Sequence, residues 1–171
     1  PQSLSCLFSV DLLESVGMSM VSCVVPAYNE EESLPIFWKK LTEVLRTLGR
    51  PWEVVVVNDG STDGTAKVLS ELAAQHPELQ IVTLPSNRGK SLGLMAGFKA
   101  AKGEYIVTLD ADLQDDPQEI PHLLELLEST PADLVGGWKK DRHDQFVKLA
   151  STRVFNGIAE GSRKTKFSKL T

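Results

Sequence analysis

The sequence predicts an α/β protein with a Rossmann-like, mostly parallel sheet flanked by helices. Short β-branched runs alternate with longer segments whose apolar residues recur at helical spacing, which is typical of βαβ units. The chain has 171 residues, enough for one such domain and too few for two. Polar residues gather just after the strand-like runs, where open parallel sheets bind their ligands.

The elements follow from these patterns in order along the chain. The predicted strands cover residues 21–26, 52–58, 79–84, 105–110 and 133–138. The first helical pattern keeps five large apolar residues on one face and stops near Gly49 and Pro51. The second and fourth patterns are carried by Val68, Leu69 and Leu72 and by Ile120, Leu123, Leu124 and Leu127, and a fifth covers residues 146–159.

The third helix, about residues 90–101, carries glycines four residues apart at Gly89, Gly93 and Gly97. This stripe is compatible with a membrane dimerisation face or with close packing on the sheet. Lys90 and Lys99 interrupt it and the segment is short, so we favour packing on the sheet.

Composition sets the class of protein. A 42% hydrophobic and 24% charged chain is typical of a globular protein, and 23 acids against 18 bases argue against a nucleic-acid binder. Cys6 and Cys23 lack metal-ligand spacing, which favours a reduced, cytoplasmic compartment. No apolar run is long enough to predict a transmembrane segment, and the apolar start at residues 4–10 lacks the basic flank of a signal peptide.

Three regions are predicted. Residues 1–17 precede a natural start at Met18 and are expected to be an extra, disordered segment. Residues 18–160 form the folded domain. Residues 161–171 are basic with few large apolar residues, which predicts a disordered tail or, less favoured, a patch for anionic lipid.

The segments after the first two strands combine turn residues with functional candidates. In PAYNEEE (26–32), Asn29 and Glu32 have capping-box spacing, whereas Tyr28 is a candidate to stack on a base or simply a half-buried tyrosine. In VNDGSTDGT (57–65), Ser61 or Thr62 is expected to cap the next helix. Asp59 comes too early for that cap and is well placed to accept hydrogen bonds from a base edge or a ribose hydroxyl.

The fourth strand runs into DADLQ (110–114). In extended chain, alternate residues project to one side, so Asp110, Asp112 and Gln114 are expected to converge. Oxygen ligands suit a hard cation such as Mg²⁺ or Mn²⁺, which would neutralise a departing diphosphate. The alternative is that both aspartates only decorate a turn; an uncompensated carboxylate pair beside an apolar strand would be costly.

Other chemistry is not supported. Gly89-Lys90-Ser91 lacks the first glycine of a phosphate-binding P-loop, because Leu84 stands there. The segment from Asp116 to Glu119 has the pattern of a helix start. The three histidines accompany no nucleophile signature, and no G-x-G-x-x-G follows the first strand, so neither a hydrolase triad nor a dehydrogenase is indicated.

Four motifs in order, VPAYNEE (25–31), VVNDGSTDGT (56–65), NRGK (87–90) and LDADLQD (109–115), resemble glycosyltransferase family 2. The resemblance covers about residues 20–158, and the nearest branch is the polyprenyl-phosphate glycosyltransferases. It implies a GT-A fold and inverting transfer of a sugar from a nucleoside diphosphate, UDP favoured over GDP, to a polyprenyl phosphate at the cytosolic face of a membrane. It identifies neither the sugar nor the oligomeric state.

The resemblance also implies site residues. The nucleotide-sugar site would comprise Pro26, Tyr28, Glu30, Val57, Asp59, Lys90, Asp110, Ala111, Asp112 and Lys139. Asp110, Asp112 and Gln114 would hold the metal, and Asp112, Lys139 and Arg153 would act in catalysis. Lys139 stands where the family usually has arginine, so the bidentate fork is lost.

An acceptor phosphate is already a dianion near neutral pH and needs no general base; positive charge must instead hold the two anions in line. Family members continue beyond the region of Asn156, whereas this chain turns into a basic tail. We therefore expect an incomplete catalytic domain and keep a second hypothesis, a non-catalytic nucleotide-sugar-binding module. A sugar nucleotidyltransferase is disfavoured because its glycine-rich first loop is absent.

Overall fold

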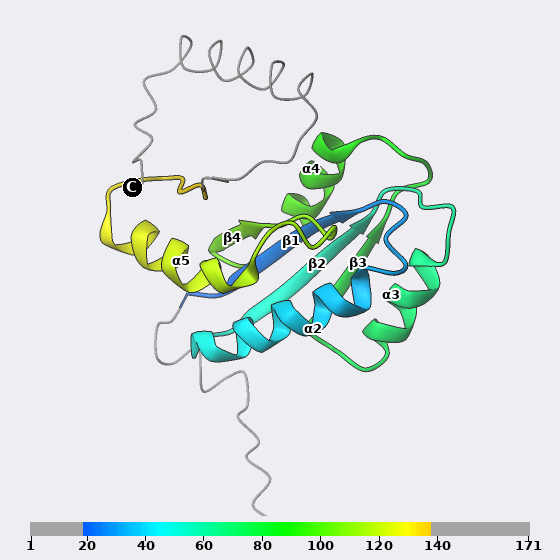
Figure 1. Cartoon of the computed structure of the whole chain (residues 1–171). Coiled ribbons are helices and arrows are strands. Elements are labelled where there is room, and N and C mark those ends of the chain that lie inside the picture. The colour runs from blue at the N-terminus through cyan, green and yellow to red at the C-terminus, as the bar shows by residue number, and fades with distance from the viewer. Residues whose placement is uncertain (1–18, 138–171) are drawn as a thin grey trace, which may run out of the picture. The chain divides into compact units, whose positions relative to one another are not determined.

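The computed structural model describes residues 19–137, which divide into two compact units at Ile120 and Pro121. The first unit contains a parallel sheet with the strand order β3-β2-β1-β4 (Figure 1). Its strands are β1 (Val21–Ala27), β2 (Trp52–Asn58), β3 (Leu79–Thr83) and β4 (Tyr105–Thr108). This confirms the predicted parallel α/β sheet, and the first four predicted strands end within two residues of the observed ones.

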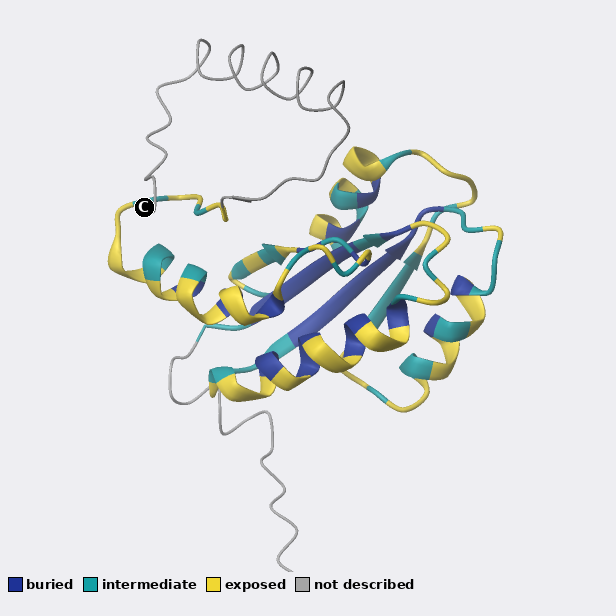
Figure 2. Ribbon diagram, viewed as in Figure 1, coloured by how far each residue is buried: buried dark blue, intermediate teal, exposed yellow. Residues whose placement is uncertain are grey.

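The two central strands are buried on both faces, which explains the apolar runs at residues 23–27 and 54–57. Val24 of β1 pairs with Val55 of β2, and both side chains are fully buried. The outer strands are more exposed: β4 alternates between exposed and half-buried residues, and β3 is buried only at its first residue (Figure 2). The core of this unit therefore lies around β1 and β2.

Helices cover both faces of this sheet. Figure 1 shows α2 (Leu34–Leu45) and α4 (Lys90–Ala100) on opposite sides of it, with α3 (Thr65–Ala73) beside α2. The predicted apolar face of α2 is buried, and a 3₁₀ turn, η1 (Arg46–Leu48), extends it to Gly49, whose φ of 65° ends the helix as the sequence predicts.

The glycines of α4 allow close packing. A Cβ at Gly97 would lie 2.3 Å from Val24 Cγ1, and one at Gly93 would lie 3.6 Å from Pro26 Cβ. Gly93 and Gly97 therefore face β1, as the packing interpretation predicts. Gly89 does not share this role, because it precedes the helix with a φ of 85°.

The predicted fifth strand is wrong within the described part of the chain. Residues 133–137 are irregular and form no ladder with a described strand, and Leu134 is 70% exposed. Only two large apolar residues precede Gly136 and Gly137, and glycine has a low propensity for strands. Trp138, the predicted helix at 146–159 and the terminal segments 1–17 and 161–171 lie outside the described residues.

The segment from Asp116 onward starts a helix, as predicted. Asp116 Oδ1 accepts the Gln118 backbone N–H at 3.0 Å, and η2 (Pro117–Glu119) leads to α5 (Ile120–Ser129). Within residues 19–137, no helix has the length and apolar character needed to cross a bilayer.

Candidate functional site

A cleft opens at the carboxyl ends of the strands, where the strand order reverses between β1 and β4. This switch point is where open α/β sheets bind ligands. The cleft is lined by the end of β1 and by segments that follow all four strands: Pro26, Ala27, Tyr28, Glu30, Asp59, Asn87, Gly89, Lys90, Asp110, Ala111 and Asp112. Eight of these eleven residues are among those predicted for the nucleotide-sugar site.

The segments after β1 and β2 are tied together by reciprocal hydrogen bonds. Asn29 Oδ1 accepts the Thr62 N–H at 2.8 Å, while the Asn29 N–H donates to Ser61 Oγ at 3.0 Å. Glu31 Oε2 accepts the Gly64 N–H at 2.6 Å. These contacts fix the backbone that carries Tyr28 and thereby preorganise one wall of the cleft.

Two predicted helix caps are corrected by these contacts. Asn29 has a φ of 56° and bonds across to Thr62 instead of forming a capping box with Glu32. Neither Ser61 nor Thr62 caps α3; Asp63 Oδ1 accepts the Thr65 N–H at 3.0 Å at the start of that helix. Desolvation raises the pKa of Asp63, but hydrogen bonds from Thr65 and the Glu31 backbone outweigh it and hold that pKa below the ordinary value of 3.8.

Asp59 holds the loop between β3 and α4. Its carboxylate is buried and accepts the backbone N–H groups of Arg88 at 2.7 Å and Gly89 at 2.8 Å. Gly60 makes this approach possible, since a Cβ there would lie 2.4 to 2.6 Å from the backbone of Ser86 and Asn87. Asp59 therefore has a structural role, and its role toward a ligand stays a prediction.

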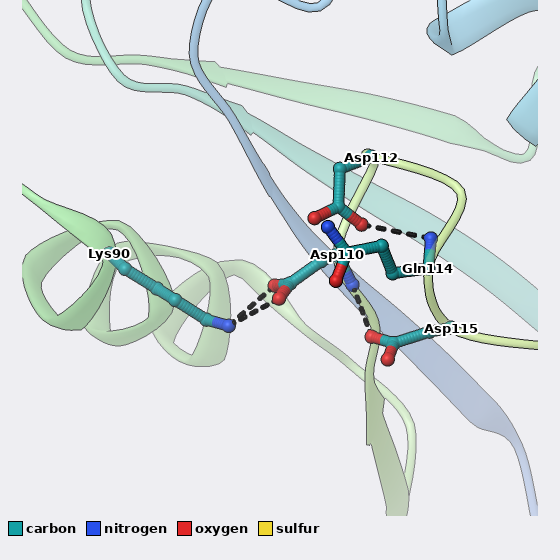
Figure 3. Close-up of polar contacts among 5 residues, drawn as sticks. All are labelled: Lys90, Asp110, Asp112, Gln114 and Asp115. Atoms are coloured by element: carbon teal, nitrogen blue, oxygen red, sulfur yellow. Dashed lines mark hydrogen bonds and ion pairs between the residues drawn. The ribbon is translucent and has the colours of Figure 1, made fainter. Parts of the chain in front are cut away.

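Lys90 and Asp110 form an ion pair on the wall of the cleft (Figure 3). Lys90 Nζ lies 2.6 Å from both Asp110 Oδ1 and Oδ2. Lys90 is the first residue of α4, and Asp110 follows β4 by two residues. The ion pair therefore connects the start of α4 with the segment after β4, next to the point where the strand order reverses. Nothing in their twenty-residue separation signals this contact.

The aspartates of the DADLQ segment lie in a turn, not in a strand as predicted. β4 ends at Thr108, and Leu113 has a φ of 63°, so the alternation of an extended chain does not apply. The turn is held by Asp112 Oδ1, which accepts the Gln114 N–H at 3.0 Å, and by Asp115, which accepts the Asp110 N–H at 2.8 Å. Figure 3 shows the Gln114 side chain extending from this turn in the direction of the two aspartates.

Two described residues of the predicted site, Val57 and Gln114, do not line the cleft. Val57 is fully buried, with Cγ2 3.1 Å from a Cβ placed on Gly97, and therefore belongs to the core. Gln114 is exposed beside the cleft. Lys139 and Arg153 lie outside the described residues. Conversely, the cleft includes Ala27, Asn87 and Gly89, for which the sequence predicted no binding role; their place in the quoted motifs was the available signal.

The donor set of the turn suits a hard cation. No group of three or more histidine, cysteine or acidic residues forms a metal cluster among residues 19–137. Asp110 and Asp112 supply carboxylate oxygens on one wall of the cleft. The ammonium group of Lys90 contacts both oxygens of Asp110, so this carboxylate already binds a positively charged group. Mg²⁺ typically takes one or two protein carboxylates and completes its shell with water and substrate phosphates, so two aspartates are sufficient.

Comparison with curated proteins shows extended similarity to lipid-linked sugar transferases. An undecaprenyl-phosphate 4-deoxy-4-formamido-L-arabinose transferase from Pectobacterium atrosepticum is 46% identical over 148 residues, which cover 85% of this chain and 45% of that protein. The enzyme of the same name from Salmonella paratyphi B is 35% identical over 147 residues, or 85% and 44% of the two chains. The chain thus spans less than half the length of these relatives.

Solved structures agree on the fold. The mannosyltransferase PcManGT from Pyrobaculum calidifontis, in complex with GDP-Man and Mn²⁺, is 33% identical with a TM-score of 0.53, covering 68% of this chain and 33% of that one. Glucosyl-3-phosphoglycerate synthase from Mycobacterium tuberculosis, in complex with Mn²⁺ and UDP-Glc, has a TM-score of 0.65 over 88% and 53% of the chains; its 22% identity supports the fold alone. The parallel sheet is therefore that of a GT-A fold. Residues 22–169 match Glycosyl transferase family 2, and the chain belongs to that family.

Proposed function

We propose that this chain carries the donor-binding part of an inverting glycosyltransferase that moves a sugar from a nucleoside diphosphate to a polyprenyl phosphate. The observation that carries the proposal is the cleft at the switch point, which combines a preorganised polar wall with Asp110, Asp112 and Lys90. The relatives named for undecaprenyl-phosphate transfer support a lipid phosphate as the acceptor. We place the reaction at the cytosolic face of a membrane, as the family resemblance implies.

In this proposal the two sides of the cleft bind different parts of the donor. Pro26, Tyr28, Glu30 and Asp59 form the side for the base and ribose, where the exposed ring of Tyr28 offers a stacking surface. Val57, buried beneath this side, supports it from the core. Lys90 and the segment from Asp110 to Asp112 form the side for the diphosphate.

Asp110 and Asp112, with the Gln114 amide as a third oxygen ligand, would hold Mg²⁺ or Mn²⁺. Such an ion supplies positive charge that stabilises the diphosphate as a leaving group. The side chains themselves position the diphosphate. The two carboxylates do so through the cation that they hold, and the ammonium group of Lys90 contributes a second positive charge beside the diphosphate. Asp112 is proposed to be catalytic in this sense.

The acceptor requires alignment more than activation. The second pKa of a phosphate monoester is near 6, so its oxygen is a competent nucleophile at neutral pH without a general base. Attack on the anomeric carbon from the side opposite the leaving diphosphate inverts the configuration at that carbon. Lys139 and Arg153 are proposed to hold the acceptor phosphate in line against the repulsion of the two anions.

Binding of donor nucleotides tests the donor half directly. We expect UDP-sugars to raise the thermal stability of the chain more than GDP-sugars, and only with Mn²⁺ or Mg²⁺ present. Asp112→Asn should weaken this binding by about tenfold or more, since a ligand to the metal loses its charge. Asp116→Asn is the matched control, because Asp116 only caps the following helix and the change in charge is the same.

Equal binding with and without a divalent cation, or equal loss in both variants, would refute the donor-site assignment. Turnover of UDP-sugar with polyprenyl phosphate tests the transfer itself. Donor binding without turnover would favour the non-catalytic binding module over the transferase for this chain.

A further inference from the structure

The bidentate contact between Lys90 and Asp110 uses the carboxylate that the proposed cation site would need. Both oxygens of Asp110 lie 2.6 Å from the same ammonium group. A divalent cation that binds Asp110 must therefore either displace Lys90 or accept its positive charge as a close neighbour.

The position of Lys90 in the fold is electrostatically unfavourable without this partner. It is the first residue of α4, where the helix dipole is positive, and the first turn of α4 contains no acidic residue. Asp110 supplies the compensating charge. Because the side chains are 60% and 31% exposed, the pair is a weak one that water can separate.

We propose that Lys90 is a built-in counter-ion that competes with the divalent cation for Asp110 and yields it when a diphosphate enters the cleft. Without a nucleotide, the ammonium group neutralises Asp110 and keeps the affinity for the metal low. A diphosphate offers Lys90 a new anionic partner, which frees both oxygens of Asp110. The inference rests on the proposed donor site and adds an order of events to it.

The competition has a thermodynamic signature. If the nucleotide releases Lys90 from Asp110, UDP must raise the affinity for Mn²⁺, and Mn²⁺ must raise the affinity for UDP by the same factor. The part of this coupling that comes from Lys90 disappears when the side chain is neutral. Phosphate oxygens that bind the metal directly account for the part that remains.

The experiment measures Mn²⁺ binding by electron paramagnetic resonance of the free ion, with and without UDP, for the full chain. Lys90→Met removes the charge and keeps most of the side-chain length. Lys99→Met is the matched control, since Lys99 is an exposed lysine near the other end of the same helix. Circular dichroism verifies that all three proteins have the same helix content.

We expect Lys90→Met to bind Mn²⁺ alone about tenfold more tightly than the wild type, as removal of a unit charge about 4 Å from a divalent ion allows. UDP should then enhance Mn²⁺ binding by a smaller factor than in the wild type, while Lys99→Met follows the wild type in both measurements. Unchanged or weaker Mn²⁺ binding by Lys90→Met, or an unchanged enhancement by UDP, overturns the role of Lys90 and leaves the donor site standing. Absence of Mn²⁺ binding by every protein, even with UDP, overturns the donor site as well.

Discussion

Replacing Gly97 with alanine is expected to destabilise the protein, because a methyl group at this position has no space against the sheet. Its Cβ would lie 2.3 Å from Val24 Cγ1 and 3.1 Å from Val57 Cγ2. Both valines are fully buried in the central strands, and a β-branched side chain has few alternative rotamers. Overpacking typically costs about 1–3 kcal/mol, whereas glycine to alanine within a helix contributes about 1 kcal/mol of stability. We therefore expect a net loss of up to about 2 kcal/mol in the free energy of unfolding.

Gly93→Ala is the matched control, four residues earlier on the same face of α4. Its Cβ would lie 3.6 Å from Pro26 Cβ and 3.9 Å from Val57 Cγ1, which is ordinary van der Waals contact. This variant should gain up to about 1 kcal/mol from helix propensity. Urea denaturation followed by circular dichroism should therefore shift the two midpoints in opposite directions. A Gly97→Ala midpoint at or above that of the wild type would show that α4 does not approach β1 and β2 this closely.

Two other positions give predictions of the same kind. Gly60→Ala should lower the melting temperature far more than Gly49→Ala. Both glycines have positive φ, but only a Cβ at Gly60 meets backbone, at 2.4 Å from the carbonyl carbon of Ser86; similar losses would refute that contact. Burial raises the pKa of the Cys23 thiol from 9.0 to about 12, so in a Cys6→Ser background it should resist a disulfide reagent at pH 8 until urea unfolds the chain. Rapid labelling of the folded protein would contradict the burial of this thiol. Since the raised pKa favours the protonated folded form, its contribution to the free energy of unfolding is complete below pH 9 and is lost as the pH rises toward about 12.

The fold was largely predictable because buried strands and helices have recognisable apolar patterns in the local sequence. The central strands are rich in buried valines, and α2 repeats large apolar residues at helical spacing. The fifth strand failed because a strand also requires a partner ladder, which a local pattern does not reveal. The same limit explains β4, whose predicted end continued two residues into a turn.

The predicted caps at Asn29 and at Ser61 or Thr62 were wrong for a related reason, whereas the cap at Asp116 is confirmed. Capping rules consider only partners within three residues along the chain, and they predicted a capping box between Asn29 and Glu32. In the structure Asn29 bonds to Thr62, which is 33 residues away, because parallel strands bring the segments after β1 and β2 together. Side chains in these two segments therefore form hydrogen bonds with the neighbouring segment, and not with residues close to them in the sequence.

The contact between Lys90 and Asp110 follows from topology. Gly93 and Gly97 let α4 lie close against β1 and β2, which requires the chain to cross back over the central strands after β3. The next strand must then pair with β1 on its open edge, as β4 does. The first residue of α4 and the segment after β4 thereby meet at the same crevice. Glycines spaced four residues apart in a crossover helix can therefore indicate that the helix packs on two neighbouring strands. That packing in turn indicates which loops lie at the same site.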